Sequence, residues 1–106
     1  MPSTTENTFE QIPYDHLTLV GKKIGDYGSR EYEYRGQLGI YRLRIGESIT
    51  DDGQVVYVYQ NGRMFLNLYP TRTPLVLVGK DEEEGEFYIF RFKGNTVDVF
   101  KRKYEI

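Results

Sequence analysis

The chain has 106 residues, a formal net charge of −2 and no cysteine. This length suits one domain. The absence of cysteine excludes disulfides and thiolate metal sites. A charge so close to zero gives no general attraction to nucleic acid or to an anionic membrane, so we expect neither as a partner.

The composition favours β-structure. The sequence has 10 tyrosines and 6 phenylalanines, which are typical of strands. It has no alanine, the strongest helix former, and its 11 glycines supply turns. From residue 16 onward, short alternating apolar runs recur between glycine-containing turns. This rhythm is typical of an all-β sandwich or barrel.

The chain divides into a polar beginning and a patterned remainder. We expect residues 1–11 to form a flexible N-terminal tail and residues 12–106 to form a single all-β domain. Short connections favour an antiparallel meander, because parallel strands need long crossovers. We therefore predict about eight strands in a compact barrel or a two-layer sandwich, with little or no helix. The expected strands are residues 17–24, 29–35, 40–46, 54–60, 63–69, 74–79, 86–92 and 97–104.

The sequence of residues 29–46 predicts a hairpin with one solvent-exposed face. A loop over residues 36–39 places Arg35 opposite Ile40. In this register, apolar and aromatic side chains share one face and opposite charges meet on the other. A shift by one residue would mix the faces. The expected pairs are Tyr34–Tyr41, Tyr32–Leu43, Glu33–Arg42 and Glu31–Arg44.

Residues 54–69 predict a second hairpin, around Asn61-Gly62. This dipeptide between apolar strands favours a type I′ turn, with Gln60 opposite Arg63. Counting back from the turn gives apolar side chains on both faces. One face is expected to pair Tyr59–Met64, Tyr57–Leu66 and Val55–Leu68, and the other Val58–Phe65 and Val56–Asn67.

Residues 86–104 predict a third hairpin, with Gly94-Asn95 as its loop. It also has apolar side chains on both faces. One face pairs Phe92–Val97, Phe90–Val99 and Tyr88–Lys101, and the other pairs Arg91–Asp98, Ile89–Phe100 and Phe87–Arg102, with Glu86–Lys103 beyond.

Two connections give less regular patterns. A loop over residues 25–28 would oppose Lys23 to Arg30, a poor pairing, so we expect either an irregular link or pairing of the first strand elsewhere. The acidic stretch from Lys80 to Gly85 is expected to connect strands that place Val78 near Phe87. We interpret it as a solvated loop that discourages aggregation, because its contiguous acids lack the alternating ligands of a calcium loop.

No motif in the sequence predicts catalysis. His16 is the only histidine, and its place beside the polar tail indicates a surface or strand-edge residue. A serine triad would have to use this residue, and a histidine-rich metal site cannot form with a single histidine. We therefore predict no catalytic residue, no metal site and no cofactor, which favours a non-enzymatic protein. A site built from tyrosine, arginine and carboxylate side chains stays open as the enzymatic alternative.

The apolar residues on both faces of the second and third hairpins are unexpected. In a sheet with one solvent-exposed face, apolar and polar residues should alternate along each strand. They have three explanations: a core that covers both faces, an exposed surface for a partner, or a barrel with an internal cavity. The candidate interaction surface consists of Phe87, Ile89, Phe100, Arg91, Arg102, Val56, Val58 and Phe65.

The sequence thus predicts an interaction module for a protein partner or for a second copy of the chain. The alternative is a barrel, lipocalin-like in architecture only, that holds a small apolar ligand in a tyrosine-lined cavity. No long apolar run or signal-peptide layout is present, so we expect a cytoplasmic location. The partner, the ligand, the oligomeric state and the biological role stay open.

Overall fold

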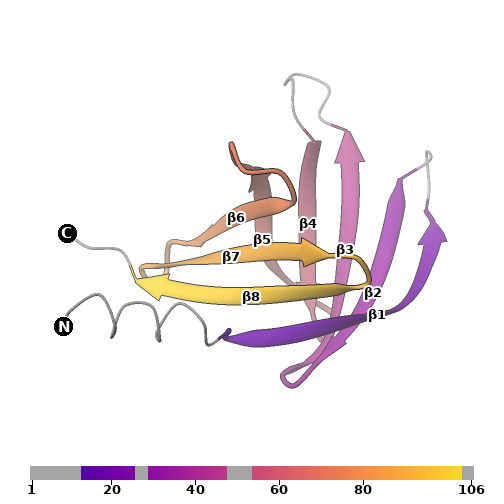
Figure 1. Cartoon of the computed structure of the whole chain (residues 1–106), viewed down its shortest axis with the longest axis horizontal. Helices are drawn as coiled ribbons and strands as arrows, with labels where there is room; N and C mark the ends of the chain where they lie inside the picture. Colours follow the sequence, from indigo (N-terminus) through magenta and orange to yellow (C-terminus); the bar gives the residue numbers. More distant parts are fainter. Residues whose placement is uncertain (1–12, 26–28, 48–53, 104–106) are drawn as a thin grey trace.

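A computed structural model describes residues 13–25, 29–47 and 54–103, and these residues form a closed antiparallel barrel. Each strand pairs with the next one along the chain, and β1 pairs with β8 (Figure 1). This closure decides for a barrel and against an open sandwich. The described residues contain no helix, and the expected tail over residues 1–11 lies outside them. The strands are β1 (Asp15–Ile24), β2 (Arg30–Gly36), β3 (Gly39–Glu47), β4 (Gln54–Gln60), β5 (Arg63–Pro70), β6 (Val76–Asp81), β7 (Glu86–Lys93) and β8 (Thr96–Lys103).

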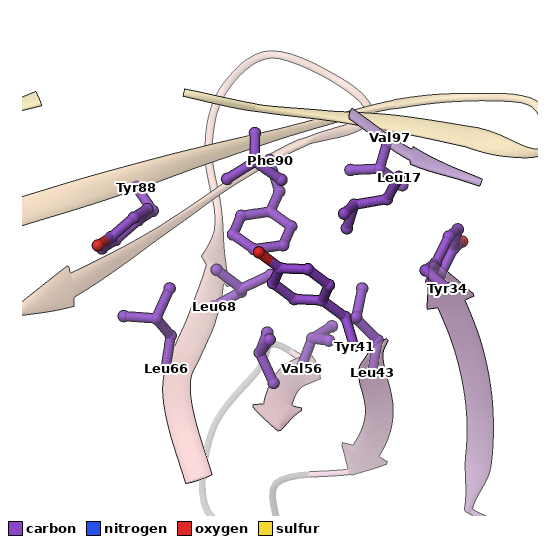
Figure 2. Packing of buried hydrophobic residues seen from close by; sticks show 12 residues of the cluster. Leu17, Tyr34, Tyr41, Leu43, Val56, Leu66, Leu68, Tyr88, Phe90 and Val97 are labelled. Carbon is purple, nitrogen blue, oxygen red and sulfur yellow. The ribbon is translucent and has the colours of Figure 1, made fainter. Parts of the chain in front are cut away.

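The interior of the barrel is filled by buried side chains from every strand except β6, which contributes the partly buried Leu77. In Figure 1, β7 and β8 run crosswise to β3 and β4, which brings distant strands over one another. Figure 2 shows Tyr41 of β3 and Phe90 of β7 pointing into the same interior, and neither is accessible to solvent. The buried cluster is Leu17, Tyr34, Tyr41, Leu43, Val56, Val58, Leu66, Leu68, Tyr88, Phe90, Val97 and Val99.

The registers predicted for the β2–β3 and β7–β8 hairpins are confirmed along their whole length. Alternation places one set of side chains inside and the other outside. Two of the ion pairs, Glu31–Arg42 and Glu86–Lys101, run diagonally, whereas Lys23–Glu31 and Arg91–Asp98 join directly opposed residues. Glu31 contacts Lys23 at 3.2 Å and Arg42 at 3.7 Å, and Glu86 contacts Lys101 at 3.3 Å. Long side chains reach diagonal neighbours in a twisted sheet, so the strand register does not by itself specify the ion pairs.

The β4–β5 hairpin begins as predicted and then departs from the prediction. Asn61 and Gly62 have φ values of 51° and 83°, as a type I′ turn requires, and Gln60 pairs with Arg63. A β-bulge then shifts the register by one residue, so Val58 pairs with Leu66 and not with Phe65. Counting from the turn was therefore wrong beyond the second pair, because a bulge sets two residues against one.

This bulge corrects the placement of Val56 and Val58. Their side chains are buried in the core, with 7% and 0% exposure, and do not lie on a second apolar face. Across from them, Leu66 and Leu68 are buried on the same side. The second apolar face of this hairpin therefore does not include Val56 and Val58, whereas Met64 and Tyr69 stay exposed.

A second bulge resolves the irregular link between β1 and β2. The register shifts between Leu19 and Gly21, so Lys23 lies opposite Glu31 and not opposite Arg30. The poor like-charge pairing expected from the sequence becomes an opposite-charge pairing. The strand also begins at Asp15, before the predicted start at residue 17, and pairs there with Val99 of β8.

The β6–β7 connection is shorter than predicted. Val78 pairs with Ile89, so the expected pairing with Phe87 was wrong. Both strands continue to the pair Asp81–Glu86, and Gly85 takes a φ of 66° in the turn between them. Because glycine tolerates this backbone conformation without a steric cost, the acidic stretch closes in a tight turn.

Candidate functional site

The register between β5 and β6 is the shortest in the barrel. Its register contains two residue pairs, Tyr69–Val78 and Pro70–Leu77, whereas β6 and β7 share six and β7 and β8 share eight. Because proline has no N–H, the backbone of Pro70 offers no hydrogen-bond donor in the second of these pairs. A Cβ on Gly79 would stand 2.8 Å from the Asn67 carbonyl oxygen, which shows that β6 still lies close against β5 beyond the two pairs.

An open groove of about 640 Å³ is lined by residues of both strands, including Tyr69, Pro70 and Val78 of the paired stretch. We call it the β5–β6 groove. Two of its apolar side chains are largely exposed, Met64 at 53% and Tyr69 at 52%. Exposed apolar side chains that gather around a hollow are typical of a binding surface. The lining residues are Met64, Phe65, Leu66, Asn67, Tyr69, Pro70, Val78, Lys80 and Glu82.

Phe65 links the groove to the core. It belongs to the bulged stretch of β5, and its ring meets Tyr88 edge to face with centroids 5.0 Å apart. On the other side, Tyr14 contacts Tyr88 in the same manner at 5.4 Å. Burial raises the pKa of the Tyr88 hydroxyl, and the charges of Tyr14 and Glu86 add to the rise. The groove therefore has a packed aromatic floor.

Asn67 carries an unusual polar atom. Its Oδ1 is buried and accepts no hydrogen bond within the described part of the chain. Buried polar atoms in folded proteins nearly always have a partner, and an orphaned one costs about 1–3 kcal/mol. Asn67 also lines the β5–β6 groove. The orphaned atom therefore lies beneath the surface, although other atoms of Asn67 line the groove.

The predicted patch on β7 and β8 is partly covered by its own side chains. Phe100 has only 6% exposure although it lies on the outer face. The guanidinium carbon of Arg91 stands 5.1 Å from the centre of its ring, and that of Arg102 stands 5.9 Å away. Phe87 and Ile89 are half-buried on the neighbouring strand. Cation–π contacts of this kind occupy the ring face that a partner would need.

One end of the barrel is closed by a buried polar network around Asp15. Its carboxylate accepts hydrogen bonds from the backbone N–H groups of His16 and Gln37 at 2.8 Å and of Leu38 at 3.2 Å. The Tyr41 hydroxyl also donates to it, at 3.0 Å. Burial and this carboxylate raise the pKa of Tyr41. Every strong contact of Asp15 is internal, so we assign the network to stability.

The predicted site residues thus separate into three places. Phe65 lies in the groove, the patch on β7 and β8 stays together, and Val56 and Val58 lie in the core. Sequence reasoning missed Met64, Asn67 and Tyr69 as groove residues. Pro70 was the available signal, because a proline at a strand end weakens pairing with the next strand.

The described ranges contain no cluster of three or more histidine, cysteine, aspartate or glutamate side chains able to hold a metal ion. Within them no helix has the length and apolar character needed to span a membrane. Comparison with protein-family models, with curated proteins and with solved structures found no match for this chain.

Proposed function

We propose that this protein is a non-enzymatic interaction module that binds an apolar segment of a partner protein in the β5–β6 groove. The observation that carries the proposal is the open hollow along β5 and β6, beside which the apolar residues Met64 and Tyr69 are exposed. A cytoplasmic location stays part of this proposal and rests on the sequence.

The groove supports this function better than the outer face of β7 and β8. Phe100 on that face is buried beneath Arg91 and Arg102, whereas Met64 and Tyr69 each expose about half of their surface. Burying exposed apolar area against a partner is the main source of binding free energy at protein interfaces. The groove therefore offers more exposed apolar area that a partner could bury.

The alternative of a small apolar ligand inside the barrel has less support. Tyr41, Phe90 and Leu68 occupy the interior and have no solvent exposure. A ligand there would have to displace close-packed side chains. The groove, by contrast, needs no rearrangement of the core.

A peptide selection tests the proposal. A phage-displayed library of random nine-residue peptides would be selected on the folded protein, and the binding of the enriched peptides measured by fluorescence anisotropy. Met64→Glu should weaken binding by about tenfold, or 1.4 kcal/mol, because it places a charge among apolar contacts. Ile24→Glu is the matched control, since Ile24 is 80% exposed and does not line the groove.

Enriched peptides that bind wild type and Ile24→Glu equally, and Met64→Glu weakly, would support the groove as the binding surface. Failure to enrich any peptide, or equal binding to all three proteins, would overturn the proposal.

A further inference from the structure

We propose that the partner segment of the β5–β6 groove is apolar with a lysine or arginine at one end, and that this cation pairs with the Glu82 carboxylate. This inference rests on the proposed function and specifies the chemistry of the partner. It follows from the position of the charged residues in the groove lining and from the charge of the turn after β6.

The lining of the groove separates into an apolar part and a charged part. The apolar side chains come from β5 and from Val78 of β6. The charged lining residues are Lys80 and Glu82, which lie on either side of Asp81, where β6 ends. Because these two are close neighbours in the chain, a segment in the groove meets charge at one place and apolar side chains over most of the remaining lining.

That place is net negative. Lys80 contributes one positive charge, but residues 81–84 directly after it are all acidic. The side chains of Glu82, Glu83 and Glu84 lie in exposed residues of the turn. The described part of the chain provides none of these three carboxylates with an ion-pair partner. A cation that a partner brings to this turn would therefore meet carboxylates that no neighbour has neutralised.

The Glu82 carboxylate is not used by the fold itself. The Gly85 N–H donates to the main-chain carbonyl of Glu82 at 3.4 Å, which involves no side-chain atom. Glu86, at the start of β7, differs, because it has 8% exposure and its carboxylate contacts Lys101 Nζ at 3.3 Å. The barrel thus pairs the glutamate that it buries and leaves Glu82 with the groove lining.

This charge would select among apolar segments and would supply only part of the affinity. An exposed ion pair raises affinity by about two- to fivefold, whereas burial of Met64 and Tyr69 involves larger apolar areas. An acidic segment would be repelled by the turn. A small uncharged ligand would gain nothing from it. The groove therefore favours a segment that combines apolar and basic residues.

The first test uses the peptides enriched from the nine-residue library. Lysine and arginine should be more frequent beside the apolar run of these peptides than in the unselected library. Affinity should fall by about two- to fivefold when sodium chloride is raised from about 50 mM to about 500 mM, because salt screens exposed charges. Enriched peptides without an excess of lysine or arginine, and with no dependence of affinity on salt, would overturn this inference and leave the groove as a binding surface.

Charge reversal tests the contact itself. Glu82→Gln should weaken binding of the tightest peptide by about two- to fivefold, and Glu82→Lys by about tenfold. Glu33→Gln is the matched control and should keep wild-type affinity, because Glu33 lines a different hollow with Lys22 and Arg42. A peptide in which glutamate replaces the cation should bind Glu82→Lys more tightly than wild type. Circular dichroism and thermal unfolding would show that the variants are folded.

The outcomes separate this inference from the proposed function. Equal affinity of the peptide for wild type and both Glu82 variants, with binding still weakened by Met64→Glu, would overturn the pairing with Glu82 and leave the groove as a binding surface. A dimer of the free protein that Met64→Glu dissociates, measured by light scattering, would assign the groove to a second copy and overturn a separate basic partner. A library that enriches nothing would overturn both proposals.

Discussion

The Tyr41 hydroxyl donates a hydrogen bond to Asp15 Oδ2 at 3.0 Å and accepts one from Gln60 Nε2 at 3.0 Å. This contact joins the first strand to β3 and β4 inside the barrel. Asp15 has 2% exposure and Tyr41 has none. A buried carboxylate is stable only when hydrogen bonds replace its lost hydration. The pair therefore holds one end of the barrel in a single arrangement.

Tyr41→Phe should lower the free energy of unfolding by about 1–2 kcal/mol, because it removes one donor from Asp15 and one acceptor from Gln60. Urea denaturation at pH 7 would measure the change. Tyr69→Phe, at an exposed tyrosine, serves as the control and should change stability by no more than about 0.5 kcal/mol. A similar loss in both variants would contradict a special role for the Asp15–Tyr41 contact.

Asp98 should make stability depend on acid pH. Burial would raise the pKa of this carboxyl, but hydrogen bonds from His16 and Arg91 outweigh that effect and hold the pKa below its usual value of 3.8. His16 Nδ1 lies 2.6 Å from Asp98 Oδ1, and an Arg91 guanidinium nitrogen lies 3.3 Å from Oδ2. The carboxylate binds protons less readily when folded than when unfolded. Its stabilisation is therefore present above the unfolded pKa and is lost as pH falls through the folded one.

Asp98→Asn should accordingly be less stable than wild type at pH 7, and the difference should shrink as the pH falls below about 4. Urea titrations at neutral and acid pH would measure it. Glu83→Gln, in the exposed turn, is the control for loss of one negative charge. A difference between Asp98→Asn and wild type that stays constant over this pH range would refute the role of Asp98.

Gly79→Ala should destabilise the protein by about 1–3 kcal/mol, because a Cβ there overpacks the crossing of β5 and β6. The new atom would stand 2.8 Å from the Asn67 carbonyl oxygen and 2.9 Å from Leu68 Cδ2. Gly21→Ala is a matched control, since a Cβ at Gly21 meets no atom within 4 Å. It should be neutral or stabilising by up to about 1 kcal/mol. Thermal unfolding would measure the stability change in both variants. Equal changes would contradict the close approach of β5 and β6 at Gly79.

Leu75→Gly should stabilise the protein by up to about 1 kcal/mol. Leu75 has a φ of 64°, which strains a residue with a Cβ, and its side chain is 68% exposed. Relief of about 1–2 kcal/mol of backbone strain is offset in part by the greater freedom of glycine in the unfolded chain. Leu75→Ala keeps the Cβ and should gain nothing. If alanine stabilised as much as glycine, the gain would come from the lost side chain and not from the backbone.

The amino-acid sequence by itself determined the all-β class, the hairpin order and two complete registers. Those registers follow from local chemistry, because turn residues and charge alternation act over a few neighbouring positions. The pairs Glu33–Arg42 and Arg91–Asp98 carried this information. The same reasoning failed for Val56 and Val58, because no local signal announced the bulge that turns both side chains into the core.

Only the tertiary structure decided closure of the barrel and the location of the groove. Pairing of β1 with β8 joins residues about as far apart as the chain allows, and no turn connects them. The close approach of β6 to β5 at Gly79 depends on atoms of both strands that no local sequence pattern brings together. Burial of Asp15 and the orphaned Oδ1 of Asn67 likewise result from packing between distant segments. Sequence patterns describe neighbours along the chain, whereas these features depend on neighbours in space.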